Sequence, residues 1–284
     1  LVDINKQKAF GEALDIYQGA PFCSPAIVRS GDYQAAANSD IVIITSGLPR
    51  KPGQTRLELA QVNVNILKDI TPQIVRVAPK AIYILVSNPV DVLTYVFHKI
   101  SGLPENQIMG SGTILDTARL RYGLSEHFKV AQGNIHAYVF GEHGDTSFIP
   151  WTGAYISGLS TDEYYEEMKA HGKDVKPLDK EAMLEYVQKS GGKVIAKKGA
   201  TFYAVSATVC QLVGLILAAS DSLATVSSML HGEYGIEDVC LSTLTLVGPN
   251  GIQGKVQMRM NKEEVALLKK SADALKEVIA QIEL

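Results

Sequence analysis

The stretch AIYILVS at residues 81–87 decides the fold class, because it is a continuous run of strand-forming apolar residues. A second run of this kind, IVIIT, lies at residues 41–45, and apolar residues at helical spacing fill residues 56–77 between the two. Continuous apolar runs are typical of parallel strands that are buried on both faces of a sheet. The alternation of strand, helix and strand therefore predicts an α/β protein with a doubly wound parallel sheet of the Rossmann type.

The second half of the chain has a different pattern and predicts an α+β domain. Helices are expected at residues 161–170, 179–197, 201–219 and 261–282, and strands at residues 135–140, 227–231, 239–247 and 256–260. The first half adds an expected helix at residues 6–17 and a weaker strand at residues 26–29. No repeat or low-complexity linker interrupts the chain, so we expect two tightly packed domains, over residues 1–112 and 113–284.

Polar residues follow the two apolar runs at the edge where such sheets bind ligands. In doubly wound sheets, ligands bind beyond the carboxyl ends of the parallel strands. The candidate cofactor-binding residues at these ends are Thr45, Ser46, Gly47, Val86 and Asn88.

Asp3 is a further candidate at this edge, because it closes the opening LVD, which looks like the end of a strand. It could bind a ribose hydroxyl, or it could cap the helix at residues 6–17, and the two interpretations are compatible. The glycine-rich GxGxxG turn that should precede such an acid is not in this chain, and we expect that an N-terminal piece is absent. Since that turn supplies the pyrophosphate contacts, this polypeptide as written is expected to bind a dinucleotide poorly.

Composition excludes several classes of partner. The 284 residues carry 27 Lys and Arg and 30 Asp and Glu, a net charge of −3, so bulk attraction to nucleic acid or to an anionic membrane is not expected. The longest apolar stretch, residues 209–219, is too short to span a membrane. Three widely spaced cysteines form no CxxC pair, which predicts no metal site and favours a cytoplasmic protein.

Three groups of residues could carry chemistry. His143 stands between glycines after an apolar run, and histidine is suited to proton transfer near neutral pH. Asp116 and Arg119 are three residues apart on an expected helix, where the aspartate could orient a histidine and the arginine could bind a carboxylate. The loop at residues 48–56 carries cations that could close over a substrate. Each group also has an ordinary structural explanation: a strand corner, a surface ion pair or a solvated loop.

Taken together, these groups resemble a known family. The motifs are SNPVD (87–91), GSGTILDTARLR (110–121), GEHGD (141–145) and KGAT (198–201), preceded by the cationic Gly/Pro loop. In this order they closely resemble the L-2-hydroxyacid dehydrogenases, the lactate and malate dehydrogenase family, from Leu1 to near Leu284. The resemblance implies an NAD-dependent oxidoreductase in which a hydride passes between nicotinamide and a small 2-keto or 2-hydroxy acid.

The resemblance also implies a role for each matching residue. His143 matches the proton donor and acceptor, Asp116 its hydrogen-bonded partner, and Arg56 the arginine that polarises the reacting carbonyl. For the substrate, the matching residues are Arg119 as carboxylate clamp, Asn88 near nicotinamide and substrate, Thr201 in the pocket wall, and Arg50 in the loop. For the cofactor, Asp3 matches the ribose acid that favours NAD over NADP.

The substrate remains open between two acids. GEHGD, LDTARLR and KGAT look like lactate dehydrogenases, as do Arg121 and His136, which match a fructose 1,6-bisphosphate site of some bacterial members. Arg50 favours malate dehydrogenase instead, because a guanidinium against the methyl group of pyruvate would be a buried charge without a partner. We therefore expect an L-lactate dehydrogenase, with malate dehydrogenase as the alternative.

Other classes of protein are less favoured. A non-catalytic relative is disfavoured because the matched reacting positions keep their side chains, and a glycosidase of the related NAD-using superfamily would need a different acid/base and metal set. By resemblance alone, we expect a homo-oligomer, usually a tetramer, that acts in glycolysis or fermentation under allosteric control.

Overall fold

The computed structural model describes residues 1–23, 25–49 and 55–284, without the side chain of Arg56. Its helices are α1 (Lys6–Gln18), α2 (Arg56–Val77), α3 (Val90–Ser101), α4 (Ile114–Phe128), α5 (Thr161–Ala170), α6 (Lys180–Lys198), α7 (Tyr203–Ile216) and α8 (Lys262–Ile279). Its strands are β1 (Ile41–Ile44), β2 (Ile82–Leu85), β3 (Ile108–Gly110), β4 (Ile135–His136), β5 (Tyr155–Ile156), β6 (Leu159–Ser160), β7 (Ser222–Ala224), β8 (Ser227–His231), β9 (Glu237–Ser242), β10 (Thr245–Gly248) and β11 (Gly251–Lys255). Short 3₁₀ turns lie at Ala20–Phe22, Tyr33–Ala36, Glu105–Gln107, Gln132–Asn134, Trp151–Gly153 and Glu233–Gly235.

The main sheet has five strands in the order β1-β2-β3-β8-β9. Strands β1, β2 and β3 run parallel, with Ile44 beside Leu85 and Leu85 beside Gly110, whereas β8 runs antiparallel to both β3 and β9. Because β1 and β2 are parallel and in register, the segments after Ile44 and Leu85 leave the sheet at the same edge. The expected doubly wound sheet, followed by an α+β part, is confirmed.

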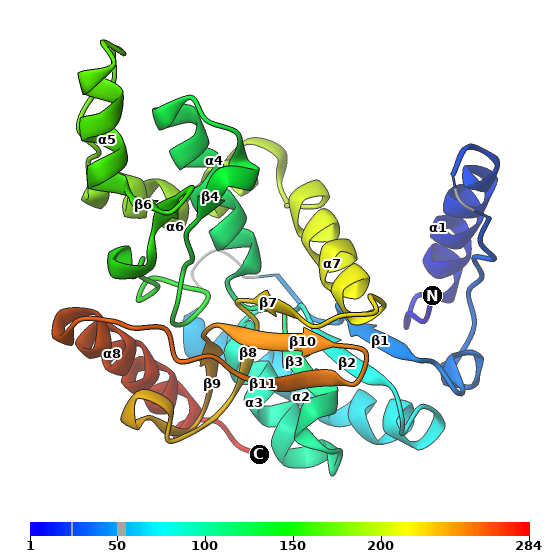
Figure 1. The fold of residues 1–284 in the computed structure, drawn as a ribbon. Coiled ribbons are helices and arrows are strands. Elements are labelled where there is room, and N and C mark those ends of the chain that lie inside the picture. The colour runs from blue at the N-terminus through cyan, green and yellow to red at the C-terminus, as the bar shows by residue number, and fades with distance from the viewer. Residues whose placement is uncertain (24, 50–54) are drawn as a thin grey trace.

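Helices and a second sheet cover the two faces of the main sheet (Figure 1). Helices α2, α3 and α8 pack on one face, where the rings of Tyr83 and Phe97 lie 5.0 Å apart in the largest core. On the other face, Ile84 and Met109 pack against Leu212 of α7 and against the three-stranded sheet β11-β10-β7. Strands β2 and β3 are buried from both sides, which fits their continuously apolar sequences. Strand β1, at the edge of the sheet, is only partly covered, and its Ile43 is 44% exposed, so the expected burial on both faces is wrong for this strand.

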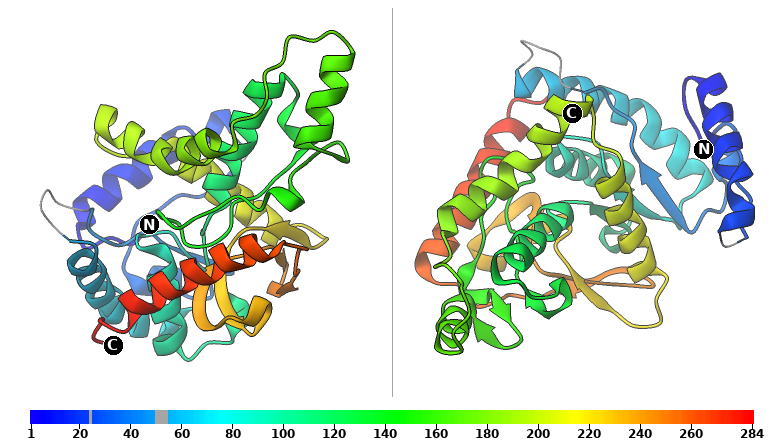
Figure 2. Two further views of the ribbon diagram at one scale, coloured as in Figure 1. Left: turned by 90° about the vertical axis from the view of Figure 1, so that its left-hand side faces the viewer. Right: turned by 90° about the horizontal axis from the view of Figure 1, so that it is seen from above.

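Helices α4, α5 and α6 and the small sheet β4-β5-β6 form a second body of the molecule (Figure 2). Their side chains form a separate core around Leu120, Leu124 and Ile156. The expected boundary near residue 112 falls between β3 and α4, and the division into two domains there stays a prediction. Strands β8 and β9, from the second half of the chain, complete the sheet of the first half, so the two halves are tightly joined.

The second half departs from the expected strands in three places. The single strand expected at residues 239–247 is two strands, β9 and β10, because β9 pairs with β8 while β10 joins the other sheet. The strand expected at residues 256–260 is wrong, since pairing with β10 ends at Lys255. In the expected strand 135–140, only β4 at its start and one bridge from Phe140 to Phe148 are extended pairs.

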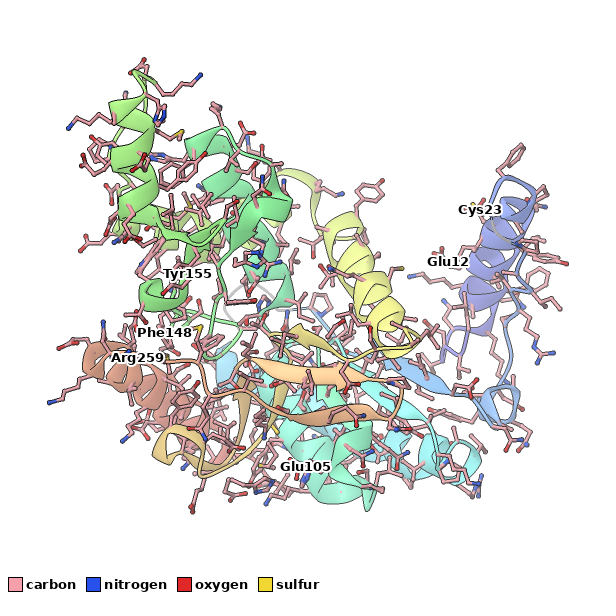
Figure 3. All side chains as sticks on the ribbon, in the orientation of Figure 1. Glu12, Cys23, Glu105, Phe148, Tyr155 and Arg259 are labelled. Carbon is pink, nitrogen blue, oxygen red and sulfur yellow. The ribbon has the colours of Figure 1, made fainter. Side chains whose placement is uncertain are left out.

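The N-terminal segment lies beyond the β1 edge, and Figure 3 shows Glu12 and Cys23 on it, away from the rest of the molecule. The expected strand at residues 26–29 is wrong, because no strand is assigned there. Helix α1 begins after Asn5, whose side chain accepts the Lys8 amide as its N-cap, so Asp3 is not the cap. The Asp3 carboxylate is exposed and accepts the Asn5 amide at 2.8 Å. Within the part of the chain that the structure describes, no helix could cross a membrane.

Candidate active site

A cavity of about 270 Å³ opens beyond the carboxyl end of β2, between the main sheet and α4, α6 and α7. Its walls contain six of the residues that the sequence singled out: Val86, Asn88, Asp116, Arg119, His143 and Thr201. Further lining residues are Ser111, Gly112, Leu115, Gly144, Asp145, Ser147, Gln188, Gly191, Gly192, Ile195, Val205 and Thr208. The fold therefore brings groups that are up to 115 residues apart, from Val86 to Thr201, around one small space.

Asp116 joins the histidine and the arginine of the cavity. Its Oδ2 lies 2.5 Å from Nδ1 of His143, and its Oδ1 accepts a hydrogen bond of 2.8 Å from Nη1 of Arg119. The Asp116 side chain is 7% exposed, whereas that of His143 is 27% exposed and faces the cavity. With Nδ1 held by the carboxylate, the imidazole is left with Nε2 for a ligand.

The charges of this group shift its pKa values in opposite directions. The negative charge of Asp116 raises the pKa of His143, against the effect of burial. Burial alone would raise the pKa of Asp116, but His143 and Arg119 hold it below its ordinary value. Asp116 also lies in the first turn of α4, where the helix dipole favours a negative charge. A protonated histidine on an ionised aspartate is thus the favoured state.

Three elements hold the backbone of the GEHGD loop. The Gly141 amide donates to the Ser242 carbonyl of β9 at 3.0 Å, and the Glu142 amide donates to Oγ of Ser271 on α8 at 2.7 Å. The His143 amide donates to Oδ2 of Asp91 on α3, also at 2.7 Å. Gly141 has a φ of +93°, and a Cβ there would stand 2.7 Å from the Ser271 hydroxyl. Three successive amides on three elements fix the position of the histidine.

A glycine in the middle of α6 makes room for the arginine. A Cβ on Gly191 would lie 3.4 Å from Nη2 of Arg119, the closest contact it would make. Glycine in a helix interior costs roughly 1 kcal/mol relative to alanine, so its presence here indicates a packing or functional reason. The Arg119 side chain is 15% exposed and lines the cavity, which suits binding of a carboxylate.

Asn63 of α2 joins the two loops that follow β1 and β2. Its Nδ2 donates to the carbonyls of Leu48 at 3.2 Å and Asn88 at 2.7 Å, and its Oδ1 accepts the Leu48 amide at 2.8 Å. A further bond of 2.7 Å runs from the Ser87 hydroxyl to the Ser46 carbonyl. Asn63 is 1% exposed, so a buried amide side chain holds the expected cofactor edge together.

The residues present at this edge fit a dinucleotide in part. Thr45, Ser46 and Gly47 are exposed beyond β1 and offer backbone and hydroxyl groups to a ligand. Val86 and Asn88, beyond β2, belong to the wall of the His143 cavity, so a ligand along this edge reaches the histidine. The segment after β1 thus offers polar contacts, and the apolar side chain of Val86 lies near the proton donor His143. This combination fits a nicotinamide nucleotide.

The remaining predicted site residues lie elsewhere. Arg50 and the side chain of Arg56 lie outside the described part of the chain. Arg121 is on the same helix as Arg119, but its Nε donates to the Ala137 carbonyl at 3.1 Å, beside the exposed His136. Neither Arg121 nor His136 lines the cavity.

Sequence reasoning gave no role to Asn63, Asp91, Ser271, Gln188, Gly191 and Gly192. Asp91 lies inside the SNPVD motif, and Gly191 and Gly192 interrupt an otherwise helical pattern. Both features could have been identified from the sequence. Asn63 and Ser271 look like ordinary polar helix residues, and only their long-range contacts reveal them.

A Rossmann-type sheet with a His–Asp pair and an arginine at its ligand edge has the arrangement of a nicotinamide-dependent dehydrogenase. Residues 1–110 match the family described as "lactate/malate dehydrogenase, NAD binding domain". Residues 113–283 match the family described as "lactate/malate dehydrogenase, alpha/beta C-terminal domain". The chain therefore belongs to the lactate/malate dehydrogenase family. It is an NAD-dependent oxidoreductase that acts on the CH–OH group of a 2-hydroxy acid.

Curated relatives and solved structures agree with this assignment. The chain is 47% identical to "L-lactate dehydrogenase 1" of Clostridium acetobutylicum, over 99% of this chain and 89% of the relative. It is 45% identical to "L-lactate dehydrogenase" of Acetivibrio thermocellus, over 100% and 89% of the two chains. The crystal structure of the minor L-lactate dehydrogenase from Enterococcus mundtii superimposes with a TM-score of 0.93 at 33% identity, covering 100% of this chain and 90% of that one.

Proposed function

We propose that this protein is an NAD-dependent L-lactate dehydrogenase, which interconverts pyruvate and L-lactate. The observation that carries the proposal is the group His143–Asp116–Arg119 in one small cavity beside the cofactor edge. Among the described lining residues Arg119 is the one arginine, which suits a substrate with one carboxylate. Identities of 42–47% to L-lactate dehydrogenases over at least 99% of the chain support the same substrate.

Each residue of the group has a distinct role in pyruvate reduction. Arg119 binds the substrate carboxylate and fixes the keto carbon in the cavity. His143, protonated, donates the Nε2 proton to the carbonyl oxygen as negative charge develops there. Asp116 holds Nδ1 and stabilises the imidazolium before the transfer. In lactate oxidation the same groups act in reverse, with neutral His143 taking the hydroxyl proton.

NAD supplies the hydride chemistry when it is bound. Thr45, Ser46, Gly47, Val86 and Asn88 would hold it along the ends of β1 and β2, with the exposed carboxylate of Asp3 as the proposed ribose ligand. From the resemblance, Arg56 would stabilise the carbonyl oxygen of the substrate in the closed site. These cofactor and loop roles stay proposals.

The proposal is tested by NADH consumption. At a high NADH concentration, which offsets the expected weak binding of the dinucleotide, the purified protein should consume NADH with pyruvate faster than with oxaloacetate. His143→Ala should remove this activity and leave the remaining NADH binding unchanged. Retained turnover in His143→Ala would refute the proton-transfer role. Absence of turnover with either acid, in protein that binds NADH, would refute the dehydrogenase itself.

Malate dehydrogenase is the second candidate, and Arg50 favours it. A second guanidinium in the closed site would pair with the second carboxylate of oxaloacetate, whereas it would lack a partner beside the methyl group of pyruvate. Arg50→Gln should therefore raise the ratio of kcat/KM for pyruvate to kcat/KM for oxaloacetate. An unchanged ratio would show that Arg50 does not set the substrate.

Regulation and assembly are proposed from the resemblance. The resemblance matches Arg121 and His136 to a fructose 1,6-bisphosphate site; Nε of Arg121 donates to the carbonyl of Ala137, the residue after the exposed His136. Phe202, Tyr203 and Leu217 on and beside α7 are 56%, 81% and 69% exposed, which supports a homo-oligomer. Light scattering with and without fructose 1,6-bisphosphate measures the molar mass in solution, and so tests the proposed homo-oligomer and its response to this ligand. The three cysteines, none of them in a disulfide, support a cytoplasmic setting.

A further inference from the structure

Asp91 is buried behind the proton-transfer histidine and is not needed as its partner. It lies in the first turn of α3, is 3% exposed, and gives its Oδ2 to the His143 amide at 2.7 Å. Its Oδ1 and the nearby hydroxyl of Ser227 on β8 are both buried, and neither makes a well-formed hydrogen bond to a described residue, although that hydroxyl still stabilises the charged carboxylate. A carboxylate kept in such surroundings costs folding free energy, which points to a functional reason for it.

The carboxylate acts on the histidine in two ways. Through Oδ2 it fixes the backbone from which the imidazole projects, so the ring reaches Asp116 and the cavity from a set position. Through its charge it raises the pKa of His143, after the larger effect of Asp116. The imidazole therefore lies near two carboxylates, one bonded to the ring and one to its backbone.

We propose that Asp91 is a positioning residue for the proton transfer of this enzyme, which holds the His143 backbone and favours the protonated imidazole through its buried charge. The proposal rests on the proposed function for its kinetic part. Its structural part, the coupling between Asp91 and His143, is measurable without turnover.

Several charged groups surround this pair. His143 and Glu142 face Asp91 from the GEHGD loop, and the buried Cys240 faces it from β9. Asp116 and Arg119 of α4 also act on the charge of the imidazole. Burial raises the pKa of Asp91 to about 6, while the Ser227 hydroxyl and the His143 amide act in the opposite direction. Asp91 thus changes charge inside the pH range of an activity measurement.

The central variant is Asp91→Asn, which keeps an oxygen for the His143 amide and removes the charge. Its new NH₂ group can donate to the Ser227 hydroxyl, which lies near the carboxylate, so the fold should persist. NMR titration of the histidines, with His143→Gln used for assignment, should show a lower pKa for His143 in this variant. The alkaline limb of kcat for pyruvate reduction should move to lower pH with it, while KM for pyruvate stays within about threefold, because Asp91 does not line the cavity.

Two more variants separate charge from position. Asp91→Ala removes both the acceptor and the charge, and should lower kcat by about 10²-fold, the cost of a displaced catalytic group. Ser271→Ala removes a neutral anchor from the neighbouring Glu142 amide, and should lower kcat without changing the pKa of His143. An unchanged His143 pKa in Asp91→Asn would overturn the proposal, as would an equal pKa change in Ser271→Ala.

A measurement on the unaltered protein covers the case in which Asp91→Asn does not fold. The amide resonance of His143 should follow the ionisation of Asp91, with an inflection near the pH of about 6 at which burial places the pKa of that carboxyl. A flat amide titration from about pH 4 to about pH 8, roughly two units either side of that value, would overturn the proposal. If the protein reduced no keto acid yet showed the inflection, the proposed function would fail and the coupling would stand.

Discussion

Nδ1 of His143 lies 2.5 Å from Oδ2 of Asp116, and both residues line the same cavity. The aspartate comes from the first turn of α4 and the histidine from a loop 27 residues later. Since the same carboxylate also binds Arg119, one buried group orients both the proton donor and the carboxylate clamp. Asp116 therefore couples the residue that binds the substrate carboxylate to the residue that transfers the proton.

Replacing Asp116 by Asn should separate these two tasks from folding. The amide keeps the volume but removes the charge that raises the pKa of His143, so fewer molecules hold the imidazolium at neutral pH. We expect kcat for pyruvate reduction to fall by about 10²–10⁴-fold, the usual contribution of a positioned acid. Stopped-flow NADH oxidation measures it. Asp162→Asn, at a 74% exposed side chain, is the matched control and should leave kcat within about twofold.

The pH dependence of the two reaction directions should be opposite. Pyruvate reduction needs protonated His143, and Asp116 raises the pKa of that histidine above its ordinary value of 6.5. Reduction should therefore persist above pH 6.5 and decline as the pH rises through the raised pKa, while lactate oxidation rises over the same range. Initial rates of pyruvate reduction and of lactate oxidation, measured from about pH 5 to about pH 10, cover the titration of a histidine and test this prediction. If, on raising the pH, the reduction rate already fell with a midpoint below pH 6.5, the assigned protonated state of His143 would be wrong.

The six helices whose bounds were predicted from the sequence lie within about three residues of those bounds, because helix signals are local. Helix α3 was not predicted, and α4 was expected only as the helix that carries Asp116 and Arg119. The spacing over residues 56–77 and 161–170 predicts helices with the bounds that the structure shows. Asn261, expected as a cap, forms a capping box with Glu264 at the start of α8. The position of β2, which is buried on both faces, was also predictable, because burial makes its sequence continuously apolar. The apolar run of β1 predicted the strand correctly but not its partial exposure.

The ends of strands, and the residues that hold the catalytic side chains in place, were not predictable, because both depend on contacts with residues distant in the sequence. The run at residues 239–247 consists of apolar residues with Ser and Thr between them and looks like one strand, yet it splits after Ser242, which also pairs with Gly141. The motifs identified His143 and Asp116, but their anchors lie on other elements. Ser271 is 129 residues from the amide that it binds, and no spacing rule reports such a contact.

Asn63 gives a third prediction, because it joins the loops beyond β1 and β2 through three hydrogen bonds. Asn63→Ala leaves these buried groups without partners, at a cost of about 1–3 kcal/mol in the free energy of unfolding. The loss should also loosen the cofactor edge and raise the Kd for NADH by about tenfold. Asn65→Ala, at an exposed position two residues along α2, is the control and should change neither quantity. Equal effects of the two variants would show that the cofactor edge does not depend on Asn63.

Replacing Gly191 by alanine should stabilise the protein and weaken substrate binding. Alanine is a better helix former, so Gly191→Ala in α6 should raise the free energy of unfolding by up to about 1 kcal/mol. Its Cβ would be in van der Waals contact with Nη2 of Arg119, at 3.4 Å, and would limit the movement of the carboxylate clamp, so KM for pyruvate should rise by about threefold. Gly214→Ala in α7, where a Cβ meets no atom within 4 Å, should show the stability gain alone. Denaturant unfolding and steady-state kinetics measure the two effects, and an unchanged KM in Gly191→Ala would remove the assigned role of this glycine.

Asp91→Asn should make the protein more stable at neutral pH. Burial raises the pKa of Asp91 from 3.8 to about 6, so the folded protein binds more protons than the unfolded chain between these values. Stability therefore falls as the pH rises through this window, by about 2–3 kcal/mol in total, and the cost remains at pH 7. Asparagine carries no such cost, so the variant should unfold at higher urea concentration at pH 7 and lose its advantage near pH 4, where the carboxyl is already neutral. Urea unfolding at both pH values tests this, and a variant that is equally destabilised at both would mean that the carboxylate serves the fold itself. A gain in stability together with the altered pH profile would show that the charge is retained for His143.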